Sequence, residues 1–93
     1  MNNYIEYAQT LLDRIREEQT AHQKEFFEDA RYLLERMINS PSFNTMTYAD
    51  GRYNQLIDSA LHYKTISINT WAILYRMGAK IKNFCIERGF END

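Results

Sequence analysis

Apolar residues recur with a helical period along most of the chain, and the first forty residues show this most clearly. That stretch contains no glycine and no proline. Its apolar residues fall on one side when they are wound at about 100° per residue. The pattern predicts one continuous amphipathic helix over residues 3–39, because two separate helices would not need to keep a common phase. The apolar positions are Tyr4, Ile5, Ala8, Leu11, Leu12, Ile15, Phe26, Ala30, Leu33, Leu34 and Met37.

The middle of this stretch is polar and leaves a second interpretation open. Gln19, His22 and Gln23 stand where the apolar stripe would continue. In the alternative, the chain turns at Gln19 and restarts with Thr20 as N-cap and Gln23 closing a capping box. We favour continuity, because a tight helix–helix turn without Gly, Pro or Asn is unusual.

Two shorter helices are predicted in the second half of the chain. The first covers residues 48–64, with Thr47 as its N-cap and residues 41–47 as a preceding loop. Its inward positions are Ala49, Tyr53, Leu56, Ile57, Ala60 and Leu61. An extended connector over residues 65–69 leads to the second helix, residues 70–88, which Gly89 ends. This last helix is apolar round most of its circumference, so we expect it to be the central one.

The sequence therefore predicts an all-α fold with one domain over residues 1–93, a long N-terminal helix packed on a C-terminal helical hairpin. The long helix would measure about 55 Å and the two others about 27 Å each. Half of its apolar stripe would stay uncovered, which a homodimer would bury. The predicted dimer interface is Tyr4, Ala8, Leu11, Leu12, Ile15, Gln19 and His22. The alternative is a monomeric up-down four-helix bundle.

Composition and charge limit the classes of function that we expect for this chain. The 93 residues carry a net charge of −2, which does not indicate a dedicated nucleic-acid binder. A lone cysteine permits no internal disulfide, and we see neither a signal peptide nor a run long enough to span a membrane. We therefore expect a cytoplasmic protein. No phosphate-binding glycine loop or catalytic triad order is present, so we expect neither an enzyme nor a cofactor.

Seven tyrosines in so short a chain suggest a protein-binding surface, since tyrosine suits surfaces that are both apolar and wet. The candidates are Tyr4, Tyr7, Tyr32, Tyr48 and Tyr63. The leading hypothesis is a non-enzymatic protein–protein interaction module that acts as a homodimer. It would be a small regulator, adaptor or inhibitor of a protein partner. A phage or mobile-element origin would suit a small protein of this kind.

Three other readings of the residues lead to different chemistry. Residues 66–71 are similar to the turn of a helix-turn-helix, so a DNA-binding regulator using residues 56–78 is the first alternative. The second is a helical receptor for a small anionic ligand at Arg76, Lys80 and Asn83, the main basic concentration. A metal site is not expected. Glu18, His22, Glu25 and Asp29 share a helix edge, but no second such element exists to complete a bundle site.

Overall fold

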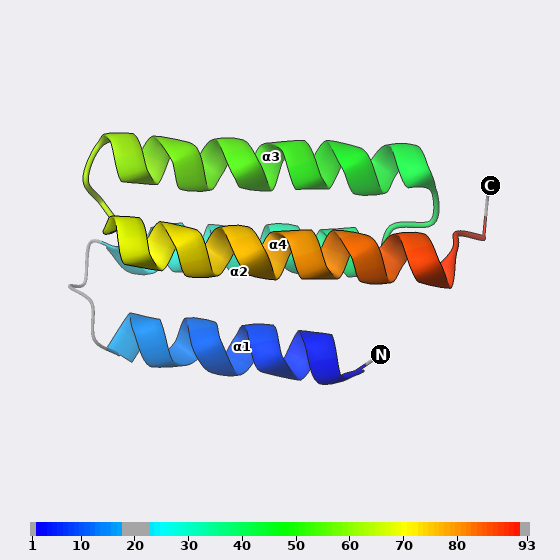
Figure 1. The fold of residues 1–93 in the computed structure, drawn as a ribbon, viewed down its shortest axis with the longest axis horizontal. Coiled ribbons are helices and arrows are strands. Elements are labelled where there is room, and N and C mark those ends of the chain that lie inside the picture. The colour runs from blue at the N-terminus through cyan, green and yellow to red at the C-terminus, as the bar shows by residue number, and fades with distance from the viewer. Residues whose placement is uncertain (1, 18–22, 92–93) are drawn as a thin grey trace.

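The computed structural model describes residues 2–17 and 23–91, which form four α-helices (Figure 1). Successive helices run in opposite directions with their axes roughly parallel. The described residues include no strand, so the predicted all-α fold is confirmed. None of the helices in this part of the chain is both long and apolar enough to cross a membrane. The helices are α1 (Asn2–Glu17), α2 (Lys24–Ile38), α3 (Phe43–His62) and α4 (Ile68–Arg88).

The predicted continuous helix over residues 3–39 is wrong. α1 ends at Glu17, α2 begins at Lys24, and the two helices pack side by side in opposite directions (Figure 1). The two halves of the apolar stripe thus contribute to one core, in which Ala8 joins Phe27 and Ala30. The dimer was inferred from the length of one continuous helix, so that argument loses its premise. Among the described stripe residues of α1, Ala8 is buried, and Ile5 and Leu11 are partly buried, within the same chain. The turn expected at Gln19 lies outside the described residues.

α3 begins five residues earlier than predicted, at Phe43. Ser42 is its N-cap, because the Ser42 hydroxyl accepts a hydrogen bond from the Thr45 N–H at 3.2 Å. The Ser42 N–H donates in turn to the Thr45 hydroxyl at 3.3 Å, which completes a capping box with threonine in the usual Glu or Gln position. Residues 43–47 are therefore helical, and Thr47 lies inside the helix instead of capping it.

α4 also begins earlier than predicted, at Ile68, with Ser67 as its N-cap. The Ser67 hydroxyl accepts from the Thr70 N–H at 3.2 Å. The N–H groups of Thr65 and Ile66 both donate to the backbone oxygen of Ala60, so a turn replaces most of the expected extended connector over residues 65–69. The turn before it uses Lys64 with φ 61°, in the left-handed region. At the C-terminal end of α4 the prediction that Gly89 ends the helix is confirmed, since α4 stops at Arg88 and Gly89 has φ 80°.

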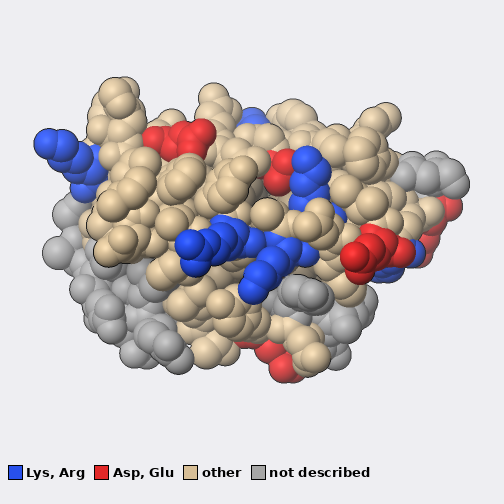
Figure 2. All heavy atoms as spheres, in the orientation of Figure 1, with Lys and Arg blue, Asp and Glu red and all other residues tan. Residues whose placement is uncertain are grey.

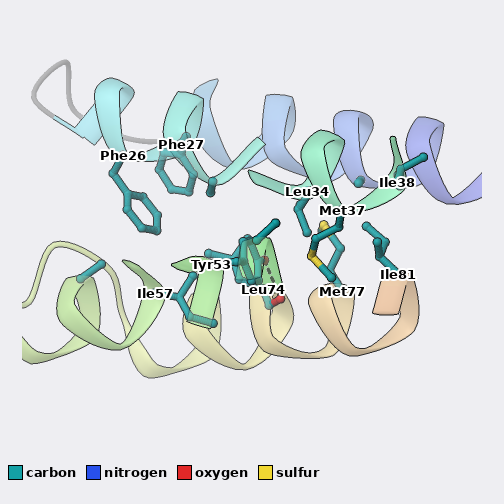
Figure 3. Packing of buried hydrophobic residues seen from close by; sticks show 14 of the residues in the cluster. Phe26, Phe27, Leu34, Met37, Ile38, Tyr53, Ile57, Leu74, Met77 and Ile81 are labelled. Atoms are coloured by element: carbon teal, nitrogen blue, oxygen red, sulfur yellow. Dashed lines mark hydrogen bonds between the residues drawn. The ribbon is translucent and has the colours of Figure 1, made fainter. Parts of the chain in front are cut away.

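The centre of the core lies between α2, α3 and α4 (Figure 3). Tyr53 is fully buried there, and its hydroxyl donates to the backbone oxygen of Leu74 at 2.6 Å. Its ring lies against Gly78, where an added Cβ would come within 2.7 Å of Tyr53 Cε2. Burial, helped by the nearby Asp50 carboxylate, raises the pKa of Tyr53 well above its ordinary value. α3 and α4 thus approach closely because a glycine faces a tyrosine.

α1 packs against α2 and α4. Ala8 is buried, while Ile5 and Leu11 are partly buried against the core. The described side chains of α1 and α2 also make polar contacts. Gln9 Nε2 donates to Glu35 Oε1 at 3.5 Å, and Asp13 Oδ1 lies 4.0 Å from an Arg31 nitrogen. Such exposed contacts add little stability.

Candidate interaction surface

A groove of about 520 Å³ runs along the surface between α2 and α3. We call it the tyrosine–arginine groove. Because α2 and α3 are antiparallel (Figure 1), Asp29 lies at the end of the groove that holds Ser59, and Arg36 at the end that holds Tyr48. The lining residues are Asp29, Tyr32, Leu33, Arg36, Tyr48, Ala49, Arg52, Gln55, Leu56 and Ser59.

Each helix supplies one exposed tyrosine with an arginine beside its ring. Tyr32 is 58% exposed and lies 5.8 Å from the guanidinium carbon of Arg36. Tyr48 is 60% exposed and lies 5.9 Å from that of Arg52, whose Nη1 also donates to the Tyr48 hydroxyl at 3.2 Å. Both pairs have the i, i+4 spacing that brings side chains together on one helix face. Arginine over tyrosine is a cation–π contact, which restrains both side chains before any partner binds.

The floor of the groove is apolar. Leu33 of α2 and Leu56 of α3 are partly buried against the core, and Ala49 is almost fully buried. A small residue at position 49 leaves space beside the larger leucines. The groove therefore offers apolar contact at its base and aromatic and cationic groups at its rim, the composition that is typical of protein-binding hot spots.

The two groove arginines form no ion pair with a carboxylate in the described part of the chain. The ion pairs present there join Arg31 to Asp13 and Glu35, and Lys82 to Asp50. Arg36 and Arg52 therefore keep their charge available, while Asp29 supplies the opposite sign at the far end. A ligand with carboxylates at one end would be both attracted and oriented.

Of the four predicted surface tyrosines whose side chains the structure describes, Tyr32 and Tyr48 come together. Tyr7 lies in a separate hollow between α1 and α4, and Tyr63 packs edge-on against His62 at the end of α3. The side chain of Tyr4 lies outside the described part of the structure. Our sequence reasoning missed the arginines, although a signal was present. The spacing Tyr-x-x-x-Arg occurs in both helices.

Two of the three predicted anion-binding residues are brought together. Arg76 and Lys80 line a hollow of about 120 Å³ with Tyr7, whose ring centroid is 5.7 Å from Lys80 Nζ. Figure 2 shows basic side chains gathered over the middle of α4. Asn83 is exposed but does not line the hollow. The residues could hold a small anion, and this role stays a prediction.

The residues predicted for a dimer interface on α1 divide into two groups. Ala8 is buried in the chain's own core, and Leu11 packs partly against it. The side chains of Tyr4, Leu12 and Ile15, together with Gln19 and His22, lie outside the described part. The residues that can be followed thus serve the fold of one chain, while dimer formation stays a prediction.

The segment predicted to bind DNA, residues 56–78, forms the end of α3 and the start of α4. The two helices lie antiparallel and side by side (Figure 1), whereas those of a helix-turn-helix cross at about 90–120°. Leu74 and Met77 are buried. Trp71 Nε1 donates to Asp58 Oδ1 at 2.8 Å, so its one polar atom already has a partner.

The remaining candidate chemistry is sparse. Among the described residues, no group of His, Cys, Asp or Glu side chains could hold a metal, and Glu18 and His22 lie outside them. Cys85 is buried with its Sγ 3.4 Å from the backbone oxygen of Met37. Burial raises the pKa of this thiol, and Arg88 opposes the shift. A buried thiol with a raised pKa is a poor nucleophile.

Comparisons with protein-family models, with curated proteins and with solved structures found no match.

Proposed function

We propose that the protein is a non-enzymatic interaction module whose tyrosine–arginine groove receives an acidic, amphipathic helix of another protein. The observation that carries the proposal is the pair of exposed tyrosines above an apolar floor, each restrained by an arginine that has no carboxylate partner among the described residues. Tyrosine and arginine are the residues most enriched at binding hot spots, together with tryptophan. Their preorganisation lowers the entropy lost on binding.

The dimensions of the groove specify the kind of partner. Its α3 wall extends from Tyr48 to Ser59, which is about 16 Å or three helical turns. A partner helix of that length would place apolar side chains on Leu33 and Leu56. Its carboxylates would meet Arg36 and Arg52, and a basic residue would suit Asp29 at the other end. By covering this helix the protein would act as a regulator, adaptor or inhibitor through contact alone.

The test uses designed helical peptides of about twelve residues with a leucine stripe flanked by glutamates. Fluorescence anisotropy with the full chain should show saturable binding, and peptides with lysine in place of glutamate should bind at least tenfold more weakly. Replacing Arg36 and Arg52 together by alanine should weaken binding of the acidic peptide at least tenfold, because two charge-assisted contacts are lost.

A matched control removes two cations from a different surface. Arg76→Ala combined with Lys80→Ala makes the same change in net charge but leaves the groove intact. The proposal fails if this control weakens peptide binding as much as the groove variant does, or if neither class of peptide binds. Retention of duplex DNA at physiological salt, lost with Arg76 and Lys80, would favour the nucleic-acid alternative instead.

A further inference from the structure

The hollow between α1 and α4 brings two cations together without an acidic neighbour (Figure 2). Arg76 and Lys80 stand four residues apart on α4, so both side chains lie on one face of the helix and line the same hollow. Tyr7 contributes from α1, while the buried Met77 and the partly exposed Ile73 supply apolar surface. None of the described residues that line the hollow is acidic. We call it the basic hollow.

Other basic side chains of α4 already have an oxygen partner. Lys82 lies 3.5 Å from the Asp50 carboxylate, and Arg88 donates to a backbone oxygen of α2 at 2.6 Å. Within the described ranges, neither Arg76 nor Lys80 has an ion-pair or side-chain hydrogen-bond partner. Two like charges at i, i+4 weakly destabilise a helix. A bound anion would relieve this repulsion, so the basic hollow is complete only with a negative group in it.

We propose that the basic hollow binds the phosphate group of a small phosphate monoester. Such a group carries about 1.5 to 2 negative charges at neutral pH, which matches the two cations. A guanidinium can donate two parallel N–H bonds to phosphate oxygens, and an ammonium adds a further charge-assisted bond. The volume of about 120 Å³ is space for about four water molecules. It suits the phosphate group itself, because pockets that enclose a whole ligand of nucleotide size measure about 300 Å³ or more.

The same features disfavour other anions. A carboxylate carries a single charge and would leave part of the repulsion between Arg76 and Lys80 in place. Duplex DNA is held by many phosphate contacts, and two cations on a chain of net charge −2 supply too few. Because both side chains are exposed, we expect weak binding, with a dissociation constant of about 1 mM that rises with salt.

The basic hollow is separate from the tyrosine–arginine groove between α2 and α3. This proposal therefore does not rest on the proposed function, and each is tested with substitutions that leave the residues of the other unchanged.

The experiment titrates the full chain with inorganic phosphate and with glycerol phosphate at constant ionic strength, followed by ¹⁵N NMR. Both ligands should shift the Arg76 side-chain N–H signal in a saturable manner, and acetate should bind about fivefold more weakly or less. Vesicles of phosphatidylcholine with phosphatidic acid present the same monoester on a lipid. Sedimentation with these vesicles distinguishes a lipid headgroup from a free ligand, and binding that depends on Arg76 in either arm supports the phosphate site.

Substitutions at Arg76 separate geometry from charge. Arg76→Lys keeps the charge but loses the paired N–H donors, so it should weaken phosphate binding about threefold or more. Arg76→Glu should abolish saturable binding. Its carboxylate can pair with Lys80 one turn away, so the variant should still fold, which circular dichroism checks. The matched control is Arg52→Glu, which makes the same change in net charge in the groove and should leave the dissociation constant within about twofold.

Four results would overturn the proposal. The first is a wild-type chain that shows no saturable shift with phosphate at tens of millimolar. The second is binding that Arg76→Glu leaves unchanged. Equal weakening by Arg76→Glu and Arg52→Glu would reduce the effect to net charge, and equal affinity for acetate and phosphate would remove the assignment to a phosphate group.

Discussion

The two sides of the bundle are held by different contacts. Between α2, α3 and α4, side chains such as Met37, Tyr53 and Leu74 have no exposed surface. Among the α1 side chains that the structure describes, Ala8 is buried, Ile5 and Leu11 are partly buried, and Gln9 and Asp13 make polar contacts with α2. Deep burial contributes far more stability than exposed polar contacts do. The α2–α4 part therefore holds the most deeply buried side chains that the structure describes, and the tyrosine–arginine groove lies on it.

The largest expected effect compares one truncation on each side. Tyr53→Ala should lower the free energy of unfolding by about 4 kcal/mol, since it opens a cavity among residues that cannot collapse fully. Leu11→Ala on α1 should cost only about 1 kcal/mol, because the side chain is partly exposed. Urea unfolding followed by circular dichroism measures both. Equal losses would show that α1 is as integral to the core as α3.

The glycines of α3 and α4 give a second comparison, in which alanine should change the stability of the chain in opposite directions. Gly78→Ala should destabilise by about 1–3 kcal/mol, because the new methyl group would meet the Tyr53 ring at 2.7 Å. Gly51→Ala is the control, since nothing lies within 4 Å of its added Cβ. There the alanine should stabilise the helix by up to about 1 kcal/mol. Thermal unfolding of both variants tests the close approach directly.

The buried hydroxyl of Tyr53 predicts a pH dependence that the exposed side of the bundle should lack. Its pKa is raised in the folded chain, so its contribution to stability is complete below the ordinary tyrosine value near 10 and is lost as the pH rises above it. Tyr53→Phe should cost about 1 kcal/mol at pH 7, through the lost bond to Leu74. Near pH 11 this deficit should shrink or reverse. A deficit independent of pH would contradict the assignment.

The smallest expected effect is a gain in stability from a substitution in the turn between α3 and α4. Lys64 adopts φ 61°, which glycine reaches without steric cost, so Lys64→Gly should stabilise by up to about 1 kcal/mol. The same change at the neighbouring Tyr63, with φ −87°, should instead destabilise. Thermal unfolding distinguishes the two signs. A loss of stability in Lys64→Gly would mean that its side chain contributes more than its backbone strain costs.

The sequence by itself determined that the chain is helical and which faces of α2 and α3 turn inward. Tyr53, Ile57 and Ala60 are buried as their spacing predicted, and Gly89 ends α4. These are local properties, because periodicity and terminal residues act within a few turns. The early starts of α3 and α4 were also encoded locally, in Ser42 and Ser67, but their capping patterns were missed.

Tertiary structure alone decided which inward faces meet. A single phase over residues 3–39 is compatible with one rod or with two helices folded together, and packing of Ala8 beside Leu34 and Ile38 selects the second. The tyrosine–arginine groove has the same origin, since each Tyr-x-x-x-Arg pair is local but their meeting depends on how α2 lies against α3. Spacing fixes a direction around one helix axis, whereas the neighbour in that direction is set by the packing free energy of the whole chain.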